Sequence, residues 1–291
     1  MLPGWHEWIV SWGEPGAIGA VIFRVLFSLI ILAAAVDPLI RLGDARAWRK
    51  GTLGAAVGPH VVRPCFRLAL AVLLVLSAAA FCLDVAGVAG LMILAAAFIF
   101  VAVVYLSLPY SGYVTANEKG ELNFHIHHHL HLAGLAVLAM SGAAVAAAAA
   151  GQAAEPARLT SWTAYALWGA VASHYFVSGL TKLKRRGLQW PDRRFLPFYL
   201  TMMARYAAGD GEQPRIGGVR QVLMRSAASG VTLLWGAFLL ELSTPLILFG
   251  FWLRLIIATC LVLFHMAIRF LMWIDFRENA MIAALTVLPF P

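Results

Sequence analysis

Long, uninterrupted apolar runs constrain the fold of this chain more than any other feature of its sequence. Each run holds about twenty residues, the length that an α-helix needs to cross the hydrocarbon core of a bilayer. The runs cover residues 17–36, 66–83, 85–108, 129–150, 162–183, 227–249 and 252–274, and a shorter one covers 280–290. They are continuous rather than alternating, which argues against a transmembrane β-barrel. The sequence therefore predicts an all-α, polytopic membrane bundle of seven to eight transmembrane helices, in a single domain over residues 1–291.

Composition supports this prediction. Of the 291 residues, 62% are hydrophobic and 12% are charged, whereas a soluble domain has about 45–50% and about 25%. One soluble globule cannot hide that much apolar surface, so a soluble enzyme and a disordered chain are excluded. The three cysteines (Cys65, Cys82 and Cys260) are far apart and odd in number, so we expect no disulfide framework.

The net charge of +8 is concentrated in two loops, residues 41–67 and 184–225. The number of intervening spans puts both loops on one side, which the positive-inside rule makes cytoplasmic. We therefore interpret the charge as facing anionic lipid rather than nucleic acid, and expect an integral protein of a bacterial inner membrane. The N-terminus lacks a basic region, so the first run is predicted to be a permanent span rather than a cleaved signal. Residues 195–206 can form an interfacial amphipathic helix.

Five histidines fall within residues 125–131, at the entrance to a predicted helix. His125, His128 and His129 share one helical face, as do His127 and His131. Imidazoles spaced in this way can bind a transition metal or pass protons. The alternative is that these side chains lie at the interface and hydrogen-bond to lipid headgroups and backbone.

A second candidate group is His174, Ser178 and Lys182, spaced four residues apart on one helical face. Removing a lysine from water disfavours its charged form and makes a neutral amine accessible as a base. The alternative is that Lys182 extends to the interface, just ahead of the basic residues 184–186.

The third group lies in the last predicted long span, where His265 and Arg269 are one turn apart and Arg254 lies about three turns earlier. Glu241, late in the preceding span, can supply a counter-charge, and Arg24 lies deep in the first span. Ionisable side chains at membrane depth are costly and are functional candidates by default. The alternative is that they form buried ion pairs that hold the bundle together.

Four segments in order resemble the horizontally transferred transmembrane (HTTM) family, whose best-known relatives are the vitamin K-dependent gamma-carboxylases. They are Phe23-Arg24 with Asp37-Pro38, Asn123-Phe124-His125, Tyr175-Phe176-Val177-Ser178-Gly179-Leu180-Thr181-Lys182-Leu183 followed by Trp190, and Phe264-His265-Met266. Together they span nearly the whole chain. Two departures are that the family has two adjacent lysines where this chain has Thr181-Lys182, and that the carboxylases carry a soluble β-rich portion, which we do not expect here.

The resemblance implies site residues and a cofactor. Lys182 falls on the family's catalytic base, and its catalytic histidine falls on His125 or, in a shifted match, on His127. A reduced quinone is implied as the cofactor, and proton abstraction from a peptide glutamate as the reaction. We add His174 and His265 as further catalytic candidates. Asn123, Ser178, Arg24, Glu241 and Arg269 are the candidates for binding substrate or cofactor.

Three functions follow as hypotheses. The first is a membrane enzyme that couples proton abstraction by Lys182 and histidine to a quinone or lipid, acting on a peptide or an isoprenoid-like lipid. The second is a metal-dependent membrane oxidase built on His125, His128 and His129. The third is a non-catalytic membrane component of a peptide maturation or export system. Motifs for phosphoryl transfer, zinc proteolysis or α/β-hydrolase chemistry are absent from the sequence.

Overall fold

The computed structural model describes residues 17–41, 60, 63–83, 88–106, 128–151, 156–189, 191–192, 194, 196–198, 200–201, 218–272 and 276–288. Within these ranges the chain forms helices and no β-strand, which confirms the all-α prediction. The α-helices are α2 (Ala17–Arg41), α4 (Pro64–Cys82), α5 (Val88–Leu106), α6 (His128–Ala149), α7 (Pro156–Arg186), α9 (Val219–Arg225), α10 (Ala227–Ser243), α11 (Phe251–Met272) and α12 (Arg277–Leu285). Two 3₁₀ helices, η2 (Gly187–Gln189) and η3 (Thr244–Phe249), follow α7 and α10.

Six helical segments within the described residues are long and apolar enough to cross a membrane. They are Gly19–Ile40, Pro64–Cys82, Val88–Tyr105, Leu130–Ala149, Ala228–Phe249 and Phe251–Leu271. The predicted span 162–183 is helical in α7, but it is not among the six, since it carries polar residues such as His174 and Lys182. The predicted short run at the chain end overlaps α12, whose nine residues are too few to span a bilayer. An integral membrane protein is thus supported, while the predicted number of seven to eight spans is not confirmed.

The chain divides into two compact units, Met1–Ala170 with Ala284–Pro291, and Val171–Ala283. The boundary falls inside α7, so the two halves of this helix belong to different units. The prediction of one HTTM-like domain stays a prediction.

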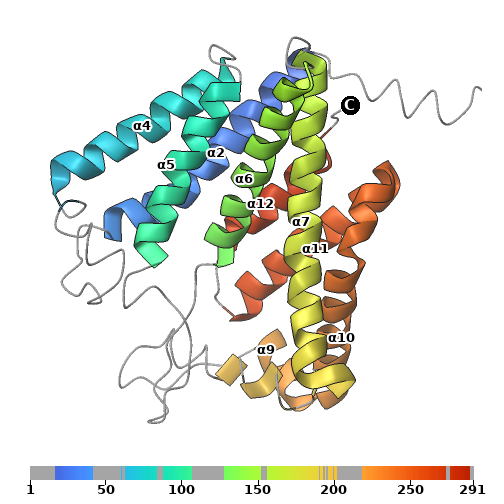
Figure 1. Cartoon of the computed structure of the whole chain (residues 1–291). Helices are drawn as coiled ribbons and strands as arrows, with labels where there is room; N and C mark the ends of the chain where they lie inside the picture. The colour runs from blue at the N-terminus through green and yellow to red at the C-terminus, as the bar shows by residue number, and fades with distance from the viewer. Residues whose placement is uncertain are drawn as a thin grey trace, which may run out of the picture. The chain divides into compact units, whose positions relative to one another are not determined.

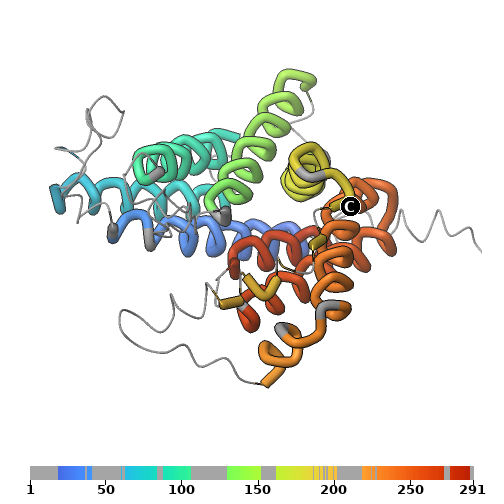
Figure 2. Tube along the Cα trace, turned by 90° about the horizontal axis from the view of Figure 1, so that it is seen from below, coloured from blue at the N-terminus to red at the C-terminus, as the bar shows by residue number. Residues whose placement is uncertain are grey.

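The first unit is built on α2, which contacts α4, α5 and α6. Figure 1 shows α2, α4 and α5 running side by side, and Figure 2 shows the same neighbours from below. Phe23 and Phe27 stack on α2 with ring centroids 5.7 Å apart, and Phe27 meets Phe81 of α4 edge-on at 6.3 Å. Such aromatic packing stabilises helix contacts in a bilayer, where lipid offers no hydrophobic driving force between helices.

The second unit contains the end of α7 together with α9, α10, α11 and most of α12. The start of α10 is capped by Ser226, whose hydroxyl accepts a hydrogen bond from the Ser229 amide at 3.3 Å. At the other end of α10, the Thr244 hydroxyl donates to the Ala172 carbonyl of α7 at 2.9 Å. This bond ties α7 to the junction of α10 with η3, close to the buried Glu241 in sequence.

Candidate functional site

The candidate site lies in the second unit, where α7 and α10 bring three polar side chains together. The Lys182 ammonium donates to Oε1 of Glu241, with which it forms a salt bridge. Ser178, one turn earlier on α7, donates to the same oxygen at 3.3 Å. The side chain of Glu241 is 5% exposed and that of Lys182 is 24% exposed. A buried carboxylate is therefore held between a hydroxyl and a partly buried amine.

The second carboxylate oxygen of Glu241, Oε2, is buried and has no hydrogen-bond partner among the described residues. A buried acceptor left in this state costs about 1–3 kcal/mol. An oxygen of this kind in a native protein calls for an explanation, and a donor supplied by a ligand or by water is one.

Gly179 allows the close packing that forms this site. A Cβ atom added at residue 179 would lie 2.9 Å from Cδ2 of Leu242 and 3.3 Å from Cβ of Glu241, both on α10. Glycine at a helix contact lets two backbones approach closely, as small residues do between membrane helices. The Ser178-Gly179 pair of the sequence motif therefore has two distinct roles, a polar contact and a close approach.

A second polar contact lies one turn before Ser178 on α7. The buried hydroxyl of Tyr175 shares a hydrogen bond with Nε2 of His265, which is buried on α11. Asn279 of α12 is buried beside the same hydroxyl, and Nδ1 of His265 is buried with no partner in the described part of the chain. Tyr175, three residues before Ser178, thus joins α7 to α11 through His265. His174 is half-buried and its ring packs edge-on against Tyr175, 5.1 Å between centroids.

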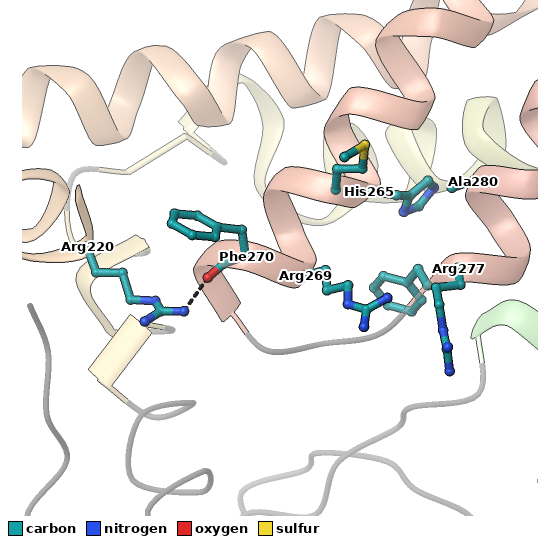
Figure 3. Close-up of a pocket in the computed structure, with 8 residues that line it drawn as sticks. Arg220, His265, Arg269, Phe270, Arg277 and Ala280 are labelled. Carbon is teal, nitrogen blue, oxygen red and sulfur yellow. Dashed lines mark hydrogen bonds between the residues drawn. The ribbon is translucent and has the colours of Figure 1, made fainter. Parts of the chain in front are cut away.

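A pocket of about 530 Å³ opens beside His265. Arginines from three helices line it, namely Arg220 of α9, Arg269 of α11 and Arg277 of α12. Figure 3 shows Arg269 next to Arg277, and Arg220 reaching the end of α11 with its bond to the Phe270 carbonyl. Met266, Phe270, Phe276 and Ala280 complete the lining.

Arg220 also stabilises the helix that carries this pocket. Its Nε donates to the Leu271 carbonyl at 3.0 Å, and a terminal nitrogen donates to the Phe270 carbonyl. The guanidinium carbon lies 5.5 Å from the centre of the Phe270 ring. The last carbonyls of an α-helix lack intrahelical donors, so Arg220 supplies the missing partners at the end of α11.

The other predicted residues are placed as follows. Asn123, His125 and His127 lie outside the described residues. His128 and His129 begin α6, but nothing is described of their side chains. No group of three His, Cys, Asp or Glu side chains that could hold a metal ion occurs among the residues that the structure describes.

Two arginines were candidates for buried ion pairs, and both are buried. Arg24 lies in α2 of the first unit, and Arg254 lies in α11 of the second. Glu241, considered as a counter-charge for the His265, Arg269 and Arg254 group, pairs instead with Lys182.

Sequence reasoning did not single out Tyr175, Asn279, Arg220 or Arg277. Tyr175 lies within the segment that ends at Lys182. Its position three residues before Ser178 places it beside Ser178 on the helix, and this spacing is the sequence signal that could have identified it. Arg220 and Arg277 resemble other loop arginines in sequence, and only the folded chain brings them to Arg269.

Comparison of the chain with protein-family models, with curated proteins and with solved structures gives no match.

Proposed function

We propose that this chain is an integral membrane enzyme in which Lys182, assisted by Glu241, removes a proton from a quinone or lipid substrate. The observation that carries the proposal is the buried carboxylate of Glu241. One of its oxygens takes the bonds from Lys182 and Ser178, and the other is buried without a partner among the described residues.

The pair offers a route to a neutral amine. Glu241 can take a proton from the Lys182 ammonium, which turns an ion pair into a neutral amine beside a carboxylic acid. Such a transfer creates no new charge in a poorly solvated site, where an isolated charge is costly. The neutral amine can then accept a proton from the substrate, and the ammonium that results stabilises the substrate anion.

The residues also fit a substrate that carries a hydroxyl. Oε2 of Glu241 is a buried acceptor without a described partner, so a substrate hydroxyl that entered between α7 and α10 would find an acceptor beside the amine. A reduced quinone, implied by the resemblance to the HTTM family, supplies an acidic hydroxyl of this kind. Action on a peptide or an isoprenoid-like lipid is part of the same proposal, as is a proton-transfer role for His125.

The test uses the purified protein in lipid nanodiscs with reduced phylloquinone as the probe. Oxygen from air oxidises the deprotonated quinol to the quinone and is itself reduced to hydrogen peroxide, so loss of the quinol reports the proton removal. We expect the wild-type protein to consume quinol faster than empty nanodiscs, and Lys182→Met and Glu241→Gln to fall to the empty-nanodisc rate. Lys184→Met is the matched control, because Lys184 is exposed two residues further along α7. The proposal is wrong if Lys182→Met consumes quinol as fast as the wild type, or if the wild type is no faster than empty nanodiscs.

A further inference from the structure

The pocket lined by Arg220, Arg269 and Arg277 is separate from the Lys182–Glu241 pair. We propose that it binds the phosphate group of an anionic lipid. This inference goes beyond the proposed function and does not depend on any role of Lys182.

The charges that surround the pocket fit a phosphate. The three arginines come from α9, from the last turn of α11 and from the first residue of α12, so three helices line one cavity. Arginine presents a planar set of N–H donors that matches phosphate oxygens, and such charge-assisted bonds are stronger than neutral ones. Bonds to the α11 carbonyls hold Arg220 in position, so less of its side-chain entropy is lost on binding.

The N-terminus of α12 adds to the positive potential at the pocket. Arg277 is the first residue of α12, and Ala280, which also lines the pocket, lies in the first turn. Amides at a helix N-terminus lack intrahelical acceptors, and the helix dipole favours an anion there. The Ala280 amide donates to the Phe276 carbonyl at 3.1 Å, so the start of α12 contributes its dipole, and the three arginines supply the hydrogen-bond donors for an anion.

The apolar part of the pocket favours a lipid over a free anion. Phe270 and Met266 line the pocket on α11, and they are 63% and 60% exposed on the surface of a segment apolar enough to span a membrane. A phosphate at the arginines could therefore continue into an acyl or isoprenoid chain along these side chains. Arg220 belongs to the basic loop 184–225, which the positive-inside rule predicts to face the cytoplasm, where anionic lipids are abundant.

The test measures binding of a fluorescent short-chain phosphatidic acid to the purified full chain in a neutral detergent. We expect saturable binding, and a loss of affinity on the order of tenfold for each of Arg269→Gln and Arg277→Gln, because each removes a charge-assisted hydrogen bond. Elution volume and Tm are measured for each variant, so that a loss of binding is distinguished from a loss of folding. Arg225→Gln, on the exposed end of α9 outside the pocket, is the matched control and should bind like the wild type.

Three competition arms distinguish the sources of the anion. Unlabelled phosphatidic acid should displace the probe, whereas phosphatidylcholine and inorganic pyrophosphate should not at the same concentration. Displacement by pyrophosphate as effective as that by the lipid would overturn the assignment of a lipid. Equal affinity of Arg269→Gln, Arg277→Gln and the wild type would overturn the site, as would an equal loss in Arg225→Gln.

Discussion

Gly179 of α7 lies so close to Leu242 of α10 that a Cβ atom at residue 179 would come within 2.9 Å of the leucine Cδ2. Gly179 lies three residues before Lys182, and Leu242 lies one residue after Glu241. Their contact therefore sets the distance between α7 and α10 at the point where the ion pair forms.

Gly179→Ala should therefore destabilise the protein even though alanine is the better helix former. Alanine at a helix interior normally gains roughly 0.5–1 kcal/mol over glycine, but overpacking costs typically about 1–3 kcal/mol. Gly169→Ala on the same helix is the matched control, because a Cβ there meets nothing within 4 Å. We expect a lower Tm than wild type for Gly179→Ala and an equal or higher Tm for Gly169→Ala, measured by thermal unfolding in detergent. Equal Tm values for the two variants would show that the helices separate without cost.

Removing one member of the Lys182–Glu241 pair should cost more than removing both. Glu241→Gln leaves a partly buried ammonium without its counter-charge. Lys182→Met leaves the Glu241 carboxylate, which is 5% exposed, without a counter-charge. Breaking a buried pair is more damaging than replacing it by apolar groups. In a double-mutant cycle we expect a coupling energy on the order of 1–3 kcal/mol between the two residues, whereas Lys184→Met combined with Glu241→Gln should show none. Additive effects of Lys182→Met and Glu241→Gln would mean that the ion pair contributes nothing.

The Tyr175–His265 hydrogen bond should also be measurable in stability. Tyr175→Phe removes the hydroxyl and leaves Nε2 of a buried histidine without its partner, at a cost of about 1–3 kcal/mol. Tyr165→Phe on the same helix should have little effect, because Tyr165 is 57% exposed. The double variant Tyr175→Phe with His265→Leu should lose less free energy of unfolding than the two single variants lose in sum. A Tm for Tyr175→Phe equal to that of Tyr165→Phe would contradict this bond.

Arg220 should control the last turn of α11. Arg220→Gln removes the donors to the Phe270 and Leu271 carbonyls, so the end of this helix should fray. We expect faster amide hydrogen exchange at the end of α11 in this variant, with unchanged exchange in α10. Arg225→Gln, on the same short helix, should exchange like the wild type throughout α11. Unchanged exchange in Arg220→Gln would mean that the helix end is held by other contacts.

The sequence by itself determined the helical class and the positions of the apolar segments. In a bilayer every backbone polar group needs an internal partner, so an apolar run of sufficient length has little choice other than a helix. The local spacing also placed Ser178 and Lys182 on one face of a helix, which the structure confirms through their shared bond to Glu241. The number of spans is not determined by apolar length alone, because α7 is long and helical but mixes apolar with polar residues and is not among the six segments apolar enough to cross.

Only the tertiary structure decided which residues meet. Glu241 lies 59 residues after Lys182, and Arg220, Arg269 and Arg277 come from three helices. Spacing along one helix is fixed by its pitch, whereas the pairing of helices depends on the shape of whole faces, such as the gap that Gly179 leaves for Leu242. No local pattern encodes that pairing: the sequence suggests Arg254, Arg269 and His265 as partners for Glu241, whereas the folded chain pairs it with Lys182.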